Sequence, residues 1–301
     1  MPVMSVVPGL PGVGGGTDCP GAGFSAVYPR TGGKRDCGTR RRPAGRRGRR
    51  KKKSLTGKGG RILKKYEYLI FDADHTLIDF EADEREAFRK LFGEYGVTAD
   101  GRMLARCREL SVQTWDDAGL SNVDDAAIQK NYHELYRSHL TLLFTRIFRE
   151  YPLGISPALA GEKFLVLLEE GGAPVKDAEC VLSALSEATG GAYKICVATN
   201  GLHAIQTGRL KGMEKYFYRV YISEDIGVIK PLSAFFSRIL GDLGAEKERC
   251  LMIGDSLDSD IAGAEGAGID SCWLNPDGRP HGSIRPDYEI RGLKELLPLL
   301  S

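Results

Sequence analysis

The segment YLIFDADHTLID (residues 68–79) places two aspartates, Asp72 and Asp74, directly after an apolar run. The apolar residues at 66–71 predict a buried strand. Two carboxylates this close repel each other, and neither belongs in a protein core without a partner. The segment is therefore either a strand that ends in a polar surface turn, or a strand that ends at a site for a metal ion and a phosphate. The rest of the chain distinguishes these two interpretations.

The chain after residue 175 alternates between short apolar runs and helical patterns, which predicts an α/β fold. Strands are expected at 193–199, 219–223, 249–254, 271–275 and 287–290. Helices are expected at 177–188, 203–213, 233–243, 258–267 and 292–300. This alternation is typical of a parallel sheet that is covered by helices on both faces.

A helical block separates the first strand from these later elements. Residues 81–97 predict an amphipathic helix, and helical periodicity continues to about residue 170 without a convincing strand. We therefore expect a Rossmann-like parallel-sheet core formed by residues 66–80 and 176–301. A second, α-helical cap domain, residues 81–175, is expected as an insertion after the first strand.

The N-terminal region differs from the rest of the chain in charge. Residues 1–65 contain 17 Lys and Arg but only two acids, a net charge of +15. Residues 66–301 contain 25 Lys and Arg and 38 Asp and Glu, a net charge of −13. The like-charged block RRRPAGRRGRRKKK (40–53) repels itself and predicts a disordered, basic, Gly- and Arg-rich tail. Such a tail either contacts nucleic acid through its phosphates or is an appendage without a role in the fold.

Cysteine spacing and hydropathy indicate the expected compartment. The seven cysteines are odd in number and include no CxxC pair, which predicts reduced thiols instead of a disulfide framework or a zinc site. No apolar run approaches the roughly 18 residues that cross a bilayer, and the N-terminal segment lacks the order of a signal peptide. We therefore expect a cytoplasmic protein without a membrane partner.

Polar residues follow four of the predicted strands, and the carboxyl ends of parallel strands meet at one edge of a sheet. In strand order they are Asp72 and Asp74, then Thr199, Asn200 and Gly201, then Lys230, then Asp255 and Asp260. Mg²⁺ prefers carboxylate oxygens as ligands. A phosphate prefers a hydroxyl, backbone N–H groups and a cation. The combination indicates transfer of a phosphoryl group.

Four motifs, FDADHTL, VATNG, IKP and IGDSLDSD, occur in this order at the four strand ends. Together they resemble the motifs of the haloacid dehalogenase (HAD) superfamily of hydrolases, and the resemblance covers about residues 66–301, including the inserted cap. Within the superfamily, the stretches VYISEDIGVIKP, MIGDSLDSDIAGAEGAG and CWLNPDGRP are similar to the pyrimidine 5′-nucleotidase branch.

The resemblance implies a role for each carboxylate. Asp72 would attack phosphorus and form an aspartyl-phosphate. Asp74 would protonate the leaving oxygen and then deprotonate the hydrolytic water. Asp72, Asp255 and the backbone carbonyl of Asp74 would bind Mg²⁺, which relieves the repulsion between the paired aspartates. Asp260 would orient the metal site or its waters.

The resemblance also implies which groups hold the substrate. Thr199 and the backbone of Asn200 and Gly201 would bind phosphate oxygens. Lys230 would neutralise charge on the phosphate and on Asp72. The substrate would therefore be a small phosphorylated metabolite that is held by its phosphate.

The acid at position 74 distinguishes the reactions of the superfamily, because an alkoxide leaves poorly without a proton whereas dehalogenation has no need of one. We therefore expect a Mg²⁺-dependent phosphohydrolase of small phosphomonoesters, with pyrimidine nucleoside 5′-monophosphates as the favoured substrates. A phosphatase or phosphomutase for a sugar phosphate or phosphoglycolate is the alternative. A nucleic-acid-binding protein that acts through the basic tail is the alternative of another class.

Four ring-bearing residues carry separate expectations. His75 stands where many members of the superfamily carry Gly, and a positive φ there would cost about 1 kcal/mol at a strained site. Trp115 and Trp273 are expected to pack against other side chains instead of stacking on a base, although Trp115, in the cap, could meet a substrate. No histidine has a spacing that indicates a metal site, and His203, directly after the TNG turn, is the one histidine that could take part in the site.

Overall fold

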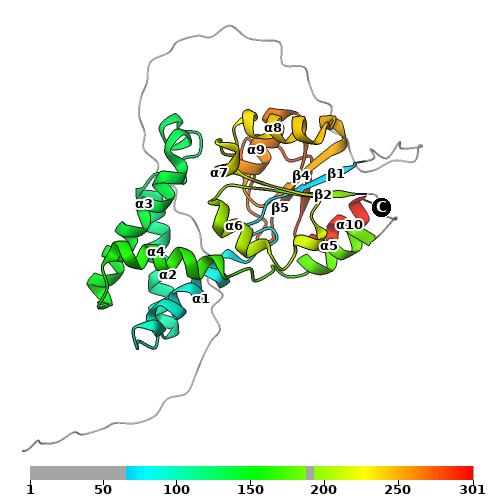
Figure 1. The fold of residues 1–301 in the computed structure, drawn as a ribbon. Coiled ribbons are helices and arrows are strands. Elements are labelled where there is room, and N and C mark those ends of the chain that lie inside the picture. The colour runs from blue at the N-terminus through cyan, green and yellow to red at the C-terminus, as the bar shows by residue number, and fades with distance from the viewer. Residues whose placement is uncertain (1–65, 188–192, 301) are drawn as a thin grey trace, which may run out of the picture. The chain divides into compact units, whose positions relative to one another are not determined.

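The computed structural model describes residues 66–187 and 193–300, all of which belong to one compact unit, Arg61–Ser301. The expectations for the basic tail, residues 1–65, concern residues outside this part of the chain. The described residues form a parallel sheet flanked by helices, with a block of further helices, α1 to α4, beside it (Figure 1).

The sheet has six parallel strands in the order β3-β2-β1-β4-β5-β6. They are β1 (Tyr68–Phe71), β2 (Lys194–Thr199), β3 (Arg219–Ile222), β4 (Cys250–Gly254), β5 (Asp270–Leu274) and β6 (Tyr288–Ile290). The direction in which strands are added reverses between β1 and β4. Ligands of such sheets bind beyond the carboxyl ends of the strands at the reversal. The predicted Rossmann-like parallel sheet is confirmed.

Helices cover both faces of this sheet. They are α5 (Ala178–Glu187), α6 (His203–Leu210), α7 (Ser223–Ile226), α8 (Ser233–Leu243), α9 (Ala262–Ala267) and α10 (Leu296–Leu300). Because side chains alternate along a strand, Leu69 and Phe71 of β1 pack with α5 and α10, whereas Tyr68 and Ile70 pack with α8 and α9. Figure 1 shows these helical layers on opposite sides of the strands.

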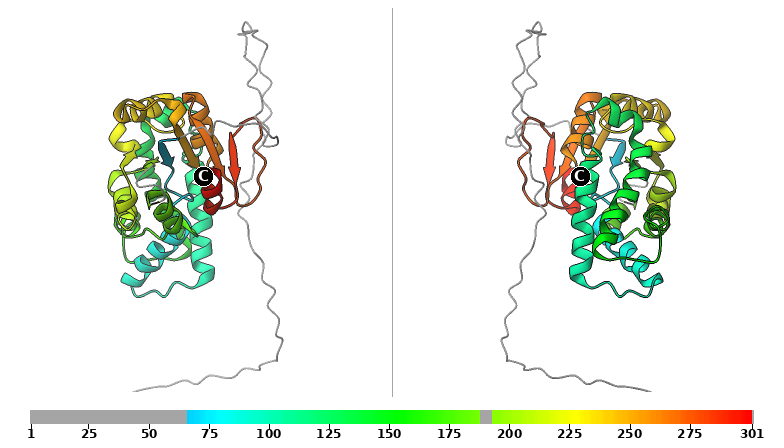
Figure 2. Two further views of the ribbon diagram at one scale, coloured as in Figure 1. Left: turned by 90° about the vertical axis from the view of Figure 1, so that its right-hand side faces the viewer. Right: turned by 90° about the vertical axis from the view of Figure 1, so that its left-hand side faces the viewer.

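Four helices between β1 and α5 form the cap. They are α1 (Phe80–Glu94), α2 (Gly101–Asp117), α3 (Ala126–Glu150) and α4 (Pro157–Glu169). The side chains that accept a backbone N–H at their starts are Asp79, Asp100, Asp125 and Ser156. These caps fix where each helix begins. Seen from the two sides, the cap helices overlap the sheet domain, behind it in the left-hand view and in front of it in the right-hand view (Figure 2).

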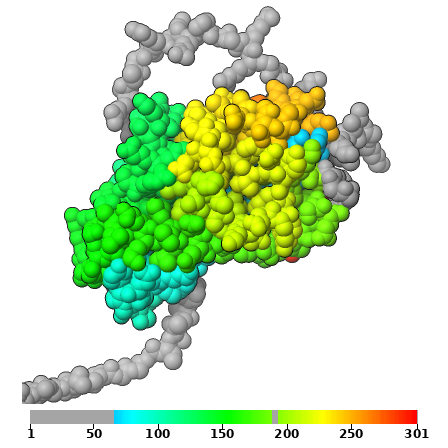
Figure 3. All heavy atoms as spheres, in the orientation of Figure 1, coloured from blue at the N-terminus to red at the C-terminus, as the bar shows by residue number. Residues whose placement is uncertain are grey.

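The cap and the sheet domain share a hydrophobic cluster. The cluster contains Phe88, Phe144 and Phe164 from the cap helices together with Leu202 and Ile205 at the start of α6. In the space-filling view the cap surface continues into that of α6 and α7 without a break (Figure 3). Helix α6 therefore packs on the sheet and on the cap at once.

Short helical turns also occur, and several of the predicted boundaries shift, for example that of the helix expected at 203–213, which ends at Leu210. The turns are η1 (Glu214–Tyr216), η2 (Lys247–Arg249), η3 (Leu257–Ile261) and η4 (Leu293–Glu295). The η3 turn has wide, π-helical hydrogen bonding, and with α9 it replaces the regular helix expected at 258–267. The strand expected at 219–223 ends one residue early because Ser223 begins α7.

The described cysteines are free, as the sequence predicted. Burial raises the pKa of the Cys107, Cys196 and Cys250 thiols to about 12, so these thiols stay protonated and unreactive. Within residues 66–187 and 193–300, no helix combines the length and the hydropathy that crossing a bilayer requires.

The central strand β1 generates the first prediction. Ile70 is 0% exposed and packs among α8 and α9. Ile70→Ala should lower the free energy of unfolding by about 2–5 kcal/mol, because it removes buried methylene groups and leaves a cavity. Val220→Ala on the edge strand β3, where Val220 is 40% exposed, should change it by less than about 0.5 kcal/mol. Urea denaturation measures both, and equal losses would contradict the assigned core.

Candidate active site

The carboxyl ends of β1, β2 and β4 bring the predicted polar residues to one edge of the sheet. Strands β1 and β4 are neighbours, and the backbone N–H of Asp72 donates to the carbonyl of Ile253 at 2.8 Å. Thr199 ends β2 on the other side of β1. Asp72 therefore lies between the loop after β2 and the loop after β4, at the reversal of strand order.

The ammonium of Lys230 lies at the centre of this edge. Its Nζ donates to Asp72 Oδ1 at 2.5 Å, to Asp260 Oδ1 at 2.7 Å and to the carbonyl of Ala198 at 2.7 Å. Lys230 is 1% exposed. Burial opposes the charged ammonium, yet Asp260 and Asp72 raise the pKa of Lys230 above its ordinary value, so the side chain stays protonated. The three protons of the ammonium are all used.

Asp72, Asp255 and Asp260 form an acidic cluster, in which one carboxylate oxygen from each residue lies within 4.8 Å of the others. Burial first, and then repulsion from Asp260, raises the pKa of Asp255 to about 6. Burial also raises the pKa of Asp72, with Lys230 opposing the rise and the other two acids adding to it. A divalent cation fits this cluster, because carboxylate oxygens are its preferred ligands and its charge offsets their repulsion.

Asp260 is fixed more firmly than the other two acids. Its Oδ1 accepts from Lys230, and its Oδ2 accepts from the backbone N–H of Ser256 at 3.1 Å. Gly254 is required here, since a Cβ at that position would lie 2.2 Å from Oδ2 of Asp260. The arrangement suits the predicted role of Asp260, which is to orient the cluster.

The loop after β2 is tied to the loop that carries the lysine. Asn200 Oδ1 accepts the backbone N–H of Lys230 at 2.8 Å, and its Nδ2 donates to the Lys230 carbonyl at 3.0 Å. The N–H of Gly201 donates to Ser223 Oγ at 3.0 Å. In this conformation Gly201 therefore shapes the loop instead of presenting a free donor to phosphate.

The side chain of Asp74 lies outside the acidic cluster and binds two residues of α6 that the sequence analysis did not identify. Arg209 Nη1 donates to Asp74 Oδ1 at 2.5 Å, and Gln206 Nε2 donates to Oδ2 at 3.0 Å. Gln206 Nε2 also donates to Thr199 Oγ1 at 2.5 Å. The two residues are three positions apart on one helical face directly after the TNG motif, and that spacing is the signal that could have identified them.

The structure also tests the expectations for His75, Trp273 and His203. His75 has a φ of 60°, the positive value expected of a position that favours Gly. Trp273 is 0% exposed and its Nε1 donates to the carbonyl of Asp255 at 2.9 Å, so it packs and anchors the loop as expected. His203 is exposed and pairs with Asp225 at 2.9 Å, so it does not join the site.

An aromatic cluster of the cap lies near the catalytic edge. Trp115 of α2 is edge-on to Tyr132 and Tyr136 of α3, with ring centroids 6.2 and 5.4 Å apart. Tyr132 packs with Ile229, from the loop that carries the lysine. Burial is the main cause that raises the pKa of both tyrosines, and the charge of Asp74 adds to each. Both phenols are therefore close enough to Asp74 to sense its charge.

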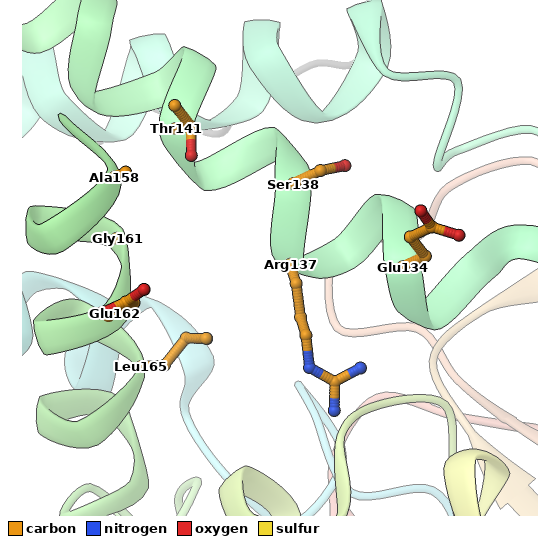
Figure 4. Close-up of a pocket in the computed structure, with 8 residues that line it drawn as sticks. All are labelled: Glu134, Arg137, Ser138, Thr141, Ala158, Gly161, Glu162 and Leu165. Carbon is orange, nitrogen blue, oxygen red and sulfur yellow. The ribbon is translucent and has the colours of Figure 1, made fainter.

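The cap also contacts the core through α7, and a hollow lies beside that contact. His133 Nε2 is 2.8 Å from Ser223 Oγ, and Arg137 pairs with Glu224. Between α3 and α4 lies an open hollow of about 450 Å³ (Figure 4). It is lined by Glu134, Arg137, Ser138, Thr141, Ala158, Gly161, Glu162 and Leu165. None of the predicted catalytic residues lines this hollow, so it is not the catalytic site.

A carboxylate that is paired with a buried ammonium at the reversal of a doubly wound sheet, next to an inserted helical cap, is typical of the capped α/β hydrolases. Comparison with family models gives the same class. The model of the haloacid dehalogenase-like hydrolases matches residues 66–268, and the chain belongs to that family.

Individual relatives narrow the class to phosphatases. PynA of Streptococcus pneumoniae, a pyrimidine 5′-nucleotidase, is 34% identical over 78% of this chain and 95% of its own. YjjG of Escherichia coli, also a pyrimidine 5′-nucleotidase, is 31% identical over 78% of this chain and 98% of its own. The magnesium-bound structure of the HAD-hydrolase YfnB from Bacillus subtilis has a TM-score of 0.66 at 31% identity, covering 79% of this chain and 99% of that one.

The raised pKa of Asp255 predicts how Mg²⁺ affects stability. In metal-free protein the contribution of this carboxyl to stability is present below its ordinary pKa and is lost as the pH rises through about 6. A Mg²⁺ ion held by this cluster would bind its ionised form, so saturating Mg²⁺ should raise the melting temperature by about 5 °C at about pH 8 and much less at about pH 5. Differential scanning fluorimetry measures the shift. With Asp255→Asn, most of the Mg²⁺ effect should disappear; an unchanged shift would place the metal elsewhere.

Proposed function

We propose that this HAD phosphatase is a Mg²⁺-dependent nucleotidase that hydrolyses pyrimidine nucleoside 5′-monophosphates through an aspartyl-phosphate on Asp72. The observation that carries the proposal is the 2.5 Å contact between Asp72 and the Lys230 ammonium. A carboxylate can approach a phosphate dianion only where fixed positive charge offsets their repulsion. The names of the two relatives, both pyrimidine 5′-nucleotidases, support the substrate class.

In the first half of the reaction, a carboxylate oxygen of Asp72 attacks phosphorus. The bond from phosphorus to the ester oxygen breaks, and Asp74 gives its proton to that oxygen, so the nucleoside leaves as an alcohol. Thr199 holds a phosphoryl oxygen, and the positive charge of Lys230 offsets the charge of the phosphate. Mg²⁺, when bound by Asp72, Asp255 and the Asp74 carbonyl, supplies positive charge that lowers the repulsion between nucleophile and phosphate.

In the second half, a water oxygen attacks the phosphorus of the aspartyl-phosphate. Asp74, now ionised, takes a proton from that water. The bond between phosphorus and the Asp72 oxygen breaks, which frees the Asp72 carboxylate and inorganic phosphate. Asp74 is protonated again and ready for the next substrate. Lys230 stays charged throughout and pairs with the carboxylate as it is released.

The aromatic cluster of the cap suits a nucleoside leaving group better than a small one. Trp115, Tyr132 and Tyr136 gather apolar rings and two phenolic hydroxyls near Asp74, the residue that must meet the leaving oxygen. A planar base offers such a surface much more contact than glycolate does. A sugar phosphate or phosphoglycolate as the substrate is the alternative that the experiment below decides.

Removal of the nucleophile should abolish turnover. Asp72→Asn should lower kcat by at least about 1000-fold, because an amide neither attacks phosphorus nor carries the negative charge. Asp258→Asn is the matched control, since Asp258 is exposed on the same loop that follows β4, and it should keep kcat within about twofold. Phosphate release measures both. Substantial turnover by Asp72→Asn, with its melting temperature retained, would show that the nucleophile is misassigned.

A substrate panel tests the proposed specificity. Phosphate release should be fastest with UMP, dUMP or TMP, slower with AMP, phosphoglycolate and sugar phosphates, and absent in EDTA. Fast, metal-dependent release from phosphoglycolate or a sugar phosphate would leave the mechanism in place and overturn the nucleotide assignment. A lack of turnover with every substrate would overturn the phosphohydrolase mechanism as well.

A further inference from the structure

Arg209 of α6 is a second buried cation, outside the acidic cluster. Its side chain is 1% exposed and contacts two carboxylates. Nη1 donates to Asp74 Oδ1 at 2.5 Å, and Nε donates to Asp83 Oδ2 at 2.8 Å. The guanidinium also lies over the Phe80 ring, 5.1 Å from its centroid. Burial opposes the charge, but Asp74 and Asp83 raise the pKa of Arg209, which therefore stays charged.

Asp83 ties this guanidinium to the cap hinge, the two connections formed by residues 75–79 and 170–177. Asp83 lies in the first turn of α1, directly after the first connection. Its two carboxylate oxygens accept the backbone N–H groups of Gly172 and Ala173 in the second connection, each at 2.9 Å. The Arg209 guanidinium therefore contacts Asp74 of the core directly. Through the carboxylate of Asp83 it is also linked to both connections between the core and the cap.

The second connection passes unusually close to Arg209. Gly172 has a φ of 120°, and a Cβ there would lie 2.4 Å from the backbone carbonyl oxygen of Arg209. Only glycine adopts this φ without strain and leaves room for the contact. The hinge and the backbone of α6 are therefore in direct contact at the residue that holds Asp74.

In the described part of the chain, Arg209 does not use all of its hydrogen-bond donors, as an ion pair with a purely structural role would be expected to do. Within the described residues, 66–187 and 193–300, its buried Nη2 has no hydrogen-bond partner. A buried donor without a partner costs free energy. The orientation is explained if the guanidinium must hold Asp74 and Asp83 at the same time.

We propose that Arg209 is a positioning residue that couples the cap hinge to the catalytic acid Asp74. Through Asp83 it takes its orientation from both connections to the cap. Through Nη1, together with Gln206, it fixes the plane of the Asp74 carboxyl group. A shift of the hinge moves Asp83, and with it the group that holds the acid. The inference rests on the proposed function, because that proposal assigns Asp74 as the acid.

The affected step is one proton transfer. As the bond from phosphorus to the leaving oxygen breaks, its electron pair stays on that oxygen, and the proton of the Asp74 carboxyl moves to it. The 5′-alkoxide of uridine needs this proton, whereas p-nitrophenolate is a stable anion and leaves without it. A residue that acts only by positioning Asp74 should therefore matter for UMP and not for p-nitrophenyl phosphate.

The test compares Arg209→Lys with Arg108→Lys in the full chain with Mg²⁺. Lysine keeps the charge of Arg209 but cannot bridge two carboxylates as the guanidinium does. Arg108 is a matched control, since it also lies over the Phe80 ring, at 5.8 Å, and pairs with Glu81 and Glu84 within the cap. The quantity measured is kcat/KM, because it reports the steps up to formation of the aspartyl-phosphate. Hydrolysis of the aspartyl-phosphate is the same step for both substrates and does not enter this quantity.

Arg209→Lys should lower kcat/KM for UMP by about 100-fold and for p-nitrophenyl phosphate by less than about threefold. Asp83→Asn, which leaves Asp74 and Arg209 in place and loosens the hinge contact, should show the same selectivity at about 10-fold. Arg108→Lys should change neither substrate by more than about twofold. Equal losses on the two substrates with Arg209→Lys would mean that Arg209 is only structural and would overturn the proposal.

A double variant decides whether Arg209 acts through Asp74. In an Asp74→Asn background, Arg209→Lys should cause no further loss on UMP, because the group that it positions is gone. An additive loss would overturn the inference. If the wild type hydrolyses another alkyl phosphate but not UMP, the proposed substrate fails and that alkyl phosphate replaces UMP in the same comparison. If Asp74→Asn does not discriminate between the two substrates, the acid is misassigned and the inference falls with it.

Discussion

The buried ammonium of Lys230 is the contact on which the catalytic edge depends. It joins Asp72 after β1, the carbonyl of Ala198 in β2 and Asp260 after β4, so one cation holds three strand ends together. Burying these charges costs several kcal/mol per ion before pairing, and apolar residues of similar volume would stabilise the fold as well. The cluster is therefore better explained by the proposed chemistry than by stability, because in that mechanism the carboxylate nucleophile needs a fixed cation that is independent of the substrate.

The fold, and the residues that lie at the catalytic edge of the sheet, could be predicted because both follow from simple regularities of sequence and sheet geometry. The run YLIF indicated a buried strand whatever its partners were, and it is β1. Parallel strands end at one edge whatever the lengths of their connections, so Asp72, Lys230 and Asp255 could be grouped although they lie far apart in the chain. His75 could be expected at positive φ because the motif usually carries Gly at that position, and its φ is 60°.

The contacts of α6 could not be predicted, because they depend on which side of the helix is buried and on how the cap lies over it. His203 is nearest to the TNG motif in sequence but is exposed, whereas Gln206 and Arg209, three and six residues later, are buried. Charged residues on a short helix are exposed by default. Arg209 and Asp83 are 126 positions apart, and no local pattern in either helix indicates their contact.

The two aspartates of the DAD motif are accommodated because each has its own cation. Asp72 pairs with Lys230 of the core, and Asp74 pairs with Arg209, which contacts the cap hinge through Asp83. Each cation lowers the electrostatic repulsion that its carboxylate meets from the other. A divalent ion then has to offset only the charge that remains on Asp72 and Asp255. In the proposed mechanism the nucleophile is consequently fixed by the core alone, whereas the orientation of the acid also depends on the cap hinge, so a shift of the hinge would act on proton transfer and not on the nucleophile.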